Sequence, residues 1–192
     1  MTEGGIIVRV SGPTVVAKSM AGARIHNRVL VGEDHLPGEV IRLEADRATI
    51  QVYEDTTGLG LGEGVTDVGK PLLAELGPGL LGSVYDGVQR PLHAIRAKSG
   101  DFIGRGQSAP PLDREIRWEF RPVAREGDEV GPGDVLGVVA ETPRVDHLVM
   151  VPPGSGGTIR RILAGAFPVL SPVAFLARET VRLVQTRERS LR

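Results

Sequence analysis

The sequence contains no cysteine, which excludes disulfide bonds, thiol catalysis and zinc–thiolate sites. Aromatic residues make up only 4% of the chain, so a core must be built mainly from Val, Leu, Ile and Ala. No run of about 18 apolar residues occurs, and no membrane-spanning helix is therefore predicted. The first ten residues lack the basic region and apolar stretch of a signal peptide, and none is expected there. These features favour a cytoplasmic location.

Lysine is also scarce, and its three positions bear on nucleotide binding. A phosphate loop needs a Gly-Lys pair followed by Ser or Thr, because backbone amides, the Lys ammonium and a hydroxyl on Mg²⁺ act together. Lys70 follows a glycine but precedes Pro71, which offers neither hydroxyl nor amide. Lys18 and Lys98 lack the glycine spacing. The sequence therefore predicts no nucleotide-binding site, no catalytic site and no ATP or Mg²⁺ cofactor in this chain.

The sequence gives equally little evidence of other ligand-binding or catalytic motifs. The four histidines occur in no metal-binding spacing, so no metal site is predicted, and His147 beside Asp146 is more typical of a turn. Trp118 and Phe120 lie two apart on one side of a predicted strand, which favours core or interface packing over ligand stacking. The net charge of −1 gives no indication of a nucleic-acid surface. Acidic residues cluster between glycines, where turn formation is favoured over a Ca²⁺ or acid–base site: these are Glu126, Asp128, Glu129 and Asp134.

The chain is instead rich in turn residues, with 26 Gly and 14 Pro. Such a composition favours short strands joined by tight loops, and we predict a mainly β fold. In residues 1–70, period-2 alternation and turn signals recur at strand-length intervals and predict a small six-stranded β-barrel. The predicted strands lie at 6–10, 14–18, 27–32, 38–46 and 47–55, with a short polar hairpin turn between the last two and one further strand after them.

The rest of the chain divides into a connector, a second β-module and a tail. Residues 71–109 are predicted to form the connector with a short helix that Pro91 ends. Residues 110–185 have the glycine turns of lipoyl- and biotinyl-type barrel-sandwich domains, but no lysine follows residue 115, which excludes a swinging-arm carrier. Residues 186–192 are predicted to be a solvated, arginine-rich tail. The predicted helix places five residues on one face: Leu80, Leu81, Val84, Tyr85 and Val88.

Several stretches resemble one family. Residues 10–59 and 71–92 are similar to the N-terminal barrel, and the signature after it, of the catalytic A (alpha) subunit of archaeal/vacuolar-type rotary ATPases. Stretches 99–106, 151–159 and 173–176 resemble the inserted bulge domain of that subunit. Of these stretches, the motif "ELGPGLLGSVYDGVQRPL" (residues 75–92) is the most specific to the family. It supplies the candidate subunit-contact and packing residues: Gly77, Pro78, Gly79, Tyr85, Asp86, Gly87, Gln89, Arg90 and Pro91.

The resemblance implies a role in assembly. In that family the barrels of A and B subunits form a crown, the bulge contacts peripheral-stalk or regulatory elements, and ATP chemistry lies in a later α/β domain. We expect an A-subunit portion of a proton- or sodium-translocating ATP synthase/ATPase that contacts B and peripheral-stalk subunits. It would meet the membrane only through the complex. The apolar side of the predicted helix is expected to be partly uncovered.

Two alternatives remain open, and the C-terminus departs from the family pattern. One alternative is a barrel-sandwich adaptor or binding module unrelated to ATP; the other is an enzyme with an undetected site. The family continues through a Trp-Pro-Val-Arg turn, whereas residues 186–192 read "TRERSLR". That difference suggests a naturally truncated or frameshifted gene product.

Overall fold

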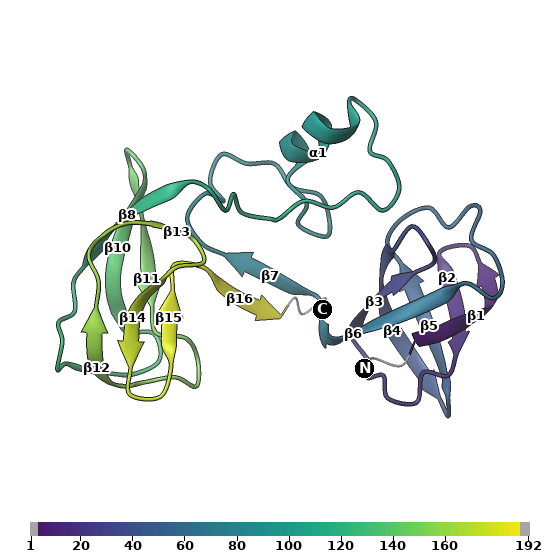
Figure 1. Ribbon diagram of the computed structural model, residues 1–192, viewed down its shortest axis with the longest axis horizontal. Helices are drawn as coiled ribbons and strands as arrows, with labels where there is room; N and C mark the ends of the chain where they lie inside the picture. Colours follow the sequence, from purple (N-terminus) through teal and green to yellow (C-terminus); the bar gives the residue numbers. More distant parts are fainter. Residues whose placement is uncertain (1–3, 189–192) are drawn as a thin grey trace.

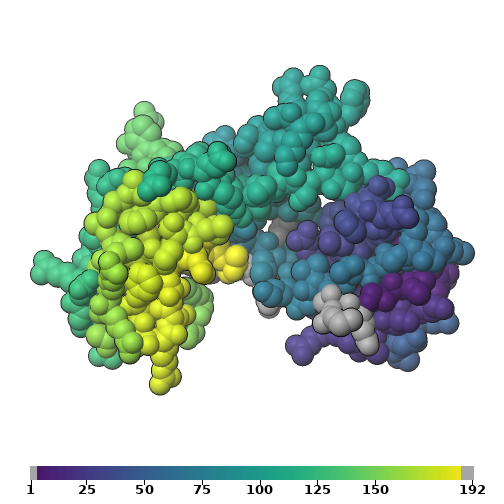
Figure 2. Space-filling model, viewed as in Figure 1, coloured from purple at the N-terminus to yellow at the C-terminus, as the bar shows by residue number. Residues whose placement is uncertain are grey.

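The computed structural model describes residues 4–188 and shows two β-domains at opposite ends of the molecule (Figure 1). The barrel lies at one end and the sandwich at the other, and the connector bridges them as a separate layer of residues (Figure 2). The connector carries helix α1 (Leu92–Ser99). Within residues 4–188, no helix is long and apolar enough to cross a membrane.

The N-terminal domain is the predicted six-stranded barrel, closed in the order β1-β2-β5-β4-β3-β6. Alternate residues point inward, as Val15 and Ala17 of β2 and Ile50 of β5 show by their complete burial. The predicted hairpin joins β4 to β5 through Ala45, whose φ is 53°. Closure leaves no exposed sheet edge in this domain. Its strands are β1 (Gly4–Ser11), β2 (Thr14–Lys18), β3 (Asn27–Val31), β4 (Leu36–Glu44), β5 (Arg47–Val52) and β6 (Gly64–Pro71).

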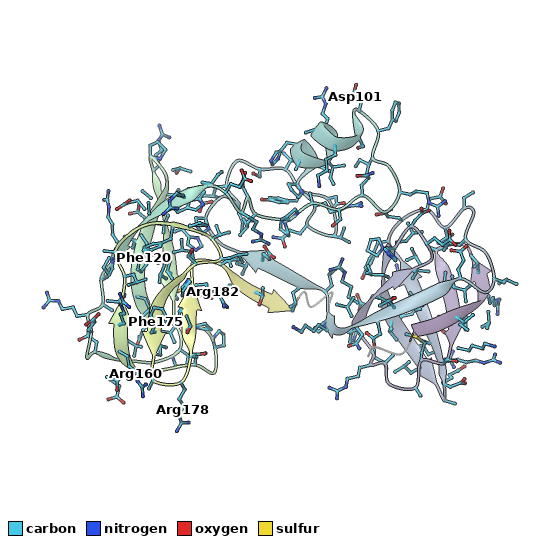
Figure 3. All side chains as sticks on the ribbon, in the orientation of Figure 1. Asp101, Phe120, Arg160, Phe175, Arg178 and Arg182 are labelled. Carbon is cyan, nitrogen blue, oxygen red and sulfur yellow. The ribbon has the colours of Figure 1, made fainter. Side chains whose placement is uncertain are left out.

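The second domain packs two four-stranded sheets against each other, in the orders β11-β10-β8-β13 and β15-β14-β12-β9. Phe120, labelled in Figure 3, is fully buried in its core. Trp118 packs against that core, as expected. Gly137 faces the ring so closely that a Cβ there would lie 2.4 Å from it. The strands are β8 (Arg117–Pro122), β9 (Glu129–Val130), β10 (Val135–Thr142), β11 (Val145–Met150), β12 (Gly157–Ile162), β13 (Gly165–Pro168), β14 (Pro172–Leu176) and β15 (Thr180–Arg182).

Two of the clustered acids have the turn role that the sequence predicts. The Asp128 carboxylate accepts the N–H of Arg125 at 2.8 Å, and the Asp134 carboxylate accepts the N–H of Gly131 at 2.7 Å. Gly127 and Gly133 have φ values of 92° and 88°, which an L-residue with a side chain rarely adopts. These carboxylates therefore close glycine turns.

A two-stranded ribbon ties the end of the second domain to the connector. Strand β7 (Leu73–Leu76) pairs with β16 (Gln185–Glu188), and Glu75 lies opposite Thr186. The ribbon thus brings together segments more than a hundred residues apart in the chain. Strand β16 crosses the predicted start of the tail, while residues 189–192 lie outside the described residues.

The predicted helix over Leu80, Leu81, Val84, Tyr85 and Val88 is wrong. This stretch consists of turns, because Gly79, Gly82 and Gln89 have φ values of 104°, 82° and 63°, which a right-handed helix does not allow. Pro91 precedes α1 instead of ending a helix, and its φ of −70° suits a helix start. The helix therefore follows the proline, whereas the apolar periodicity precedes it.

Candidate functional site

Residues 77–91, here the junction segment, contact both β-domains and the ribbon between them. Arg90 reaches the barrel side, Gln89 holds strand β7, and the amides near Gly79 bind the sandwich. All nine candidate residues of the sequence signature lie in this segment. The structure shows their contacts within the chain, and their contact with another subunit stays a prediction.

A tight loop from Asp86 to Arg90 forms the centre of the junction segment. One oxygen of the Asp86 carboxylate accepts the N–H of Val88 at 3.0 Å and that of Arg90 at 2.8 Å. Its other oxygen accepts Arg90 Nε at 2.6 Å. Gln89 lies inside this loop in the left-handed region, and Gly87 occupies its exposed side. The carboxylate therefore fixes both the loop and the direction of the Arg90 side chain.

Arg90 carries the link from this loop to the barrel side. Its guanidinium forms an ion pair with Glu54, just after strand β5, and donates to the carbonyl of Gln107 at 2.8 Å. The second oxygen of Glu54 accepts the N–H of Gly106 at 2.8 Å. The side chains of Arg90 and Glu54 are only 14% and 9% exposed, so solvent screens this pair weakly.

Charge and burial shift the pKa of the Asp86 carboxyl in opposite directions. Burial alone would raise the pKa of the Asp86 carboxyl, but hydrogen bonds from Arg90 and the charge of its guanidinium lower that pKa below its ordinary value. The same pairing raises the pKa of Arg90, although burial opposes the rise. Both groups are therefore charged at neutral pH and hold each other in place.

Gln89 covers the edge of strand β7. Its side-chain oxygen accepts the Glu75 N–H at 2.8 Å, and its amide nitrogen donates to the Glu75 carbonyl at 2.7 Å. The Glu75 side chain turns to Arg114, which donates to both carboxylate oxygens at 2.7 and 2.6 Å. Glu75 thus connects the junction segment to the chain that leads into the sandwich.

Glu141 of strand β10 anchors the start of the junction segment to the sandwich. One oxygen of its carboxylate accepts the N–H groups of Gly79 and Leu81 at 2.8 and 2.9 Å. His147 Nδ1 lies 3.8 Å from the other oxygen. Burial lowers the pKa of His147, and the nearby Glu141 charge only partly offsets this. The Glu141 side chain is 5% exposed, so the two amides are its main source of stabilisation.

The remaining signature residues shape the backbone. Gly77 is buried where a Cβ would lie 2.9 Å from Leu112, and Pro78 is buried beside it. Tyr85 forms an isolated β-bridge with Pro91, and both line a shallow groove of about 450 Å³. A side chain at Gly77 would therefore displace Leu112, and Pro78 restricts the backbone next to it.

Sequence reasoning missed the partners of this segment. Glu54, Glu75 and Glu141 stand 36, 14 and 62 residues from the groups that they bind. No local motif marks them, since an isolated glutamate in a strand or loop is usually solvated. Only the folded arrangement brings the Glu54 and Glu141 carboxylates and the Glu75 backbone to the junction segment.

None of this geometry resembles a phosphate cradle. Lys98 lies near the end of α1 and donates to the carbonyl of Ser108 at 3.0 Å, while Lys70 lies on strand β6. The loop before Pro91 and α1 runs from Asp86 to Arg90, and its Val88 and Arg90 amides already donate to the Asp86 carboxylate. In the described part of the chain, no group of three His, Asp or Glu side chains could hold a metal ion.

Comparison with known proteins matches both domains to one family. Residues 7–69 match the family model of the ATP synthase alpha/beta family β-barrel domain, and residues 109–186 match that of the ATP synthase alpha/beta subunit barrel-sandwich domain. The junction segment lies between these two matches.

Similar proteins extend the match across the junction segment. The chain is 55% identical over 172 residues to the V-type ATP synthase alpha chain of Anaeromyxobacter dehalogenans, and 56% over 173 residues to the A-type ATP synthase A subunit 2 of Methanospirillum hungatei. Each match covers 90% of this chain and 30% of the relative. The V-type ATP synthase alpha chain of Clostridium botulinum (strain Langeland) is 52% identical over 170 residues, which is 88% of this chain and 29% of that protein. The chain therefore spans about a third of the length of these relatives.

Proposed function

Because the chain belongs to the ATP synthase alpha/beta family through both of its β-domains, we propose that it serves assembly as the N-terminal part of an A (alpha) subunit of a V/A-type ATP synthase. The parent complex would couple ATP synthesis or hydrolysis to proton or sodium transport. The chain would contact B subunits and peripheral-stalk subunits on the cytoplasmic side. The observation that carries the proposal is the 55% identity to a V-type alpha chain over 90% of this chain.

The junction segment supports an assembly role through its rigidity. Three contacts fix it to both domains and to the ribbon. The buried Glu54 and Glu141 carboxylates bind Arg90 and the amides of Gly79 and Leu81, and the Gln89 side chain binds the Glu75 backbone of the ribbon. When the two domains and the connector are fixed to one another, their outer surfaces keep the same relative positions. Less conformational entropy is then lost when the chain binds a partner. This is the property expected of a subunit that holds its neighbours in register.

Capture by a B subunit tests the proposal. We expect an immobilised B subunit of a V/A-type ATP synthase to retain the full chain, and an unrelated barrel-sandwich protein to pass through. Failure to capture the chain, with the B subunit shown to be folded, would favour an adaptor unrelated to ATP.

Nucleotide chemistry is proposed to be absent from the chain by itself. None of its three lysines is followed by Ser or Thr within a glycine-rich loop that could cradle phosphates. Titration of Mg·ATP into the chain in a calorimeter should give only the heat of dilution. Saturable binding in the micromolar range would contradict this part of the proposal.

A further inference from the structure

An open cleft of about 710 Å³ lies between the barrel and the connector, and the assembly role does not yet account for it. Strands β3 and β6 of the barrel form one wall, and the stretch 106–114 with strand β7 forms the other. Six of its lining residues matter here: Arg28, Leu30, Val68, Lys70, Pro110 and Arg114.

The barrel wall of this cleft carries two cations without acidic partners. Arg28 and Lys70 come from neighbouring strands, since Asn27 of β3 lies opposite Pro71 of β6. Neither side chain forms an ion pair or hydrogen bond with another residue of the described range 4–188. Nε of Arg28 is buried and has no hydrogen-bond partner there. An unpaired buried N–H is destabilising. A ligand oxygen that accepted a hydrogen bond from it would remove this penalty, and the ligand's binding free energy would become more favourable.

The opposite wall adds a third cation that is only partly neutralised. Arg114 uses one nitrogen, Nη2, for both oxygens of Glu75, and its Nη1 is buried with no partner among the described residues. Arg90 also lines the cleft, but Glu54 and Asp86 neutralise it. The cleft therefore presents positive charge from both of its walls.

Apolar side chains accompany these cations. Leu30 lies two residues after Arg28 on β3, and Val68 two residues before Lys70 on β6, so each strand presents one cation and one apolar residue to the cleft. Pro110 faces them from the connector. A strongly hydrated polyphosphate would leave such apolar surface unused, whereas a peptide with both acidic and apolar residues would cover it.

The chain's own C-terminus does not have the required charge. Thr186 lines the cleft, and the sequence that follows it contains Arg187, Arg189 and Arg192 against one glutamate. Like charges would repel a segment of this composition from Arg28 and Lys70. The complementary occupant is therefore acidic, and residues 187–192 do not supply it.

We propose that the barrel–connector cleft binds an acidic, partly apolar peptide segment of a neighbouring subunit, whose carboxylates pair with Arg28 and Lys70. The inference rests on the proposed assembly function and names the kind of partner surface that this function requires. Carboxylates suit Arg28 in particular, because a guanidinium matches them in a two-pronged geometry.

Fluorescence polarisation with a short labelled peptide of recurring glutamates and leucines tests the inference on the full chain. We expect saturable binding that weakens with added salt. The double variant Arg28→Gln/Lys70→Gln should weaken binding about tenfold or more. The matched control Arg160→Gln/Arg178→Gln removes two exposed charges from the sandwich, where Figure 3 shows both side chains pointing outward, and should bind like the wild type.

Four outcomes would overturn the inference. The first is no saturable binding, and the second is binding by the cleft variant as tight as that by the wild type. The third is binding of a peptide with glutamine in place of glutamate as tight as that of the glutamate peptide. The fourth is displacement of the peptide by pyrophosphate at equal concentration. Circular dichroism confirms that the variants are folded, and hydrogen exchange of strands β3 and β6 in the wild-type chain provides a readout that needs no variant. Because the assay contains no B subunit, its failure is distinct from a failure of capture.

Discussion

Gln89 binds the backbone of Glu75 through both atoms of its side-chain amide, at 2.8 and 2.7 Å. The pair reproduces the hydrogen bonds that another strand would make with β7 at this residue. Strand β7 pairs with β16 on its other side, so the amide closes an edge that would otherwise be open to a second chain. The junction segment therefore protects the ribbon as well as fixing its position.

Gln89→Glu tests this edge contact. The substitution keeps the accepting oxygen but replaces the donor with a charged oxygen, which faces the Glu75 carbonyl and loses a hydrogen bond. We expect the free energy of unfolding in urea to fall by about 2 kcal/mol at neutral pH. Because protonation of the new carboxyl restores a donor, the loss should shrink in acid. A change below about 0.5 kcal/mol at neutral pH, the range of ordinary surface substitutions, would contradict the assigned role.

Arg90→Lys tests the link between the junction segment and the barrel side. A lysine keeps the charge but offers no planar fork, so it does not bind Asp86, Glu54 and the Gln107 carbonyl together. We expect a loss of about 2–4 kcal/mol, because two carboxylates remain with incomplete pairing. Arg96→Lys is the matched control, since the Arg96 side chain is 74% exposed beside Asp101, at the outer end of the connector (Figure 3). Equal stabilities of the two variants would argue against the link.

The fold was more predictable from the sequence than the junction was. Alternation in residues such as Ala48, Ile50 and Val52 indicated barrel strands, because period 2 is a local signal. The apolar residues from Leu80 to Val88 have helical spacing and led to the wrong prediction of a helix. Positive φ values at Gly82 and Gln89 exclude that helix, and the spacing of apolar residues does not reveal them. Glu141 carried no signal, because its partners lie some sixty residues away and are backbone amides.

Asp86 should make stability depend on pH. Burial would raise its pKa, but the hydrogen bonds and charge of Arg90 hold that pKa below the ordinary value of an aspartate. The stabilisation is therefore present above the ordinary pKa of an aspartate and is lost as the pH falls from there through the lowered pKa of Asp86. We expect Asp86→Asn to be less stable than the wild type at neutral pH and the two stability curves to converge in acid. Parallel curves in urea unfolding across this range would show that Asp86 does not titrate as described.

Glu141→Ala tests the attachment of the junction segment to the sandwich. Removal of the carboxylate leaves the N–H groups of Gly79 and Leu81 without their acceptor, and we expect a loss of about 2 kcal/mol. Hydrogen exchange at these two amides should accelerate, while amides in the barrel core keep their rates. Glu119→Ala on the exposed side of strand β8 is the control and should change neither quantity. Unchanged exchange at Gly79 and Leu81 would show that Glu141 does not hold them.

The central claim is that the chain acts by contacting other subunits as one fixed unit. Hydrogen exchange followed by mass spectrometry, on the chain alone and with a saturating B subunit, tests it most directly. The account predicts slower exchange over a continuous surface of the barrel or the sandwich, with no loss of protection in the junction segment. Identical exchange across all peptides of residues 4–188, with and without the B subunit, would contradict it.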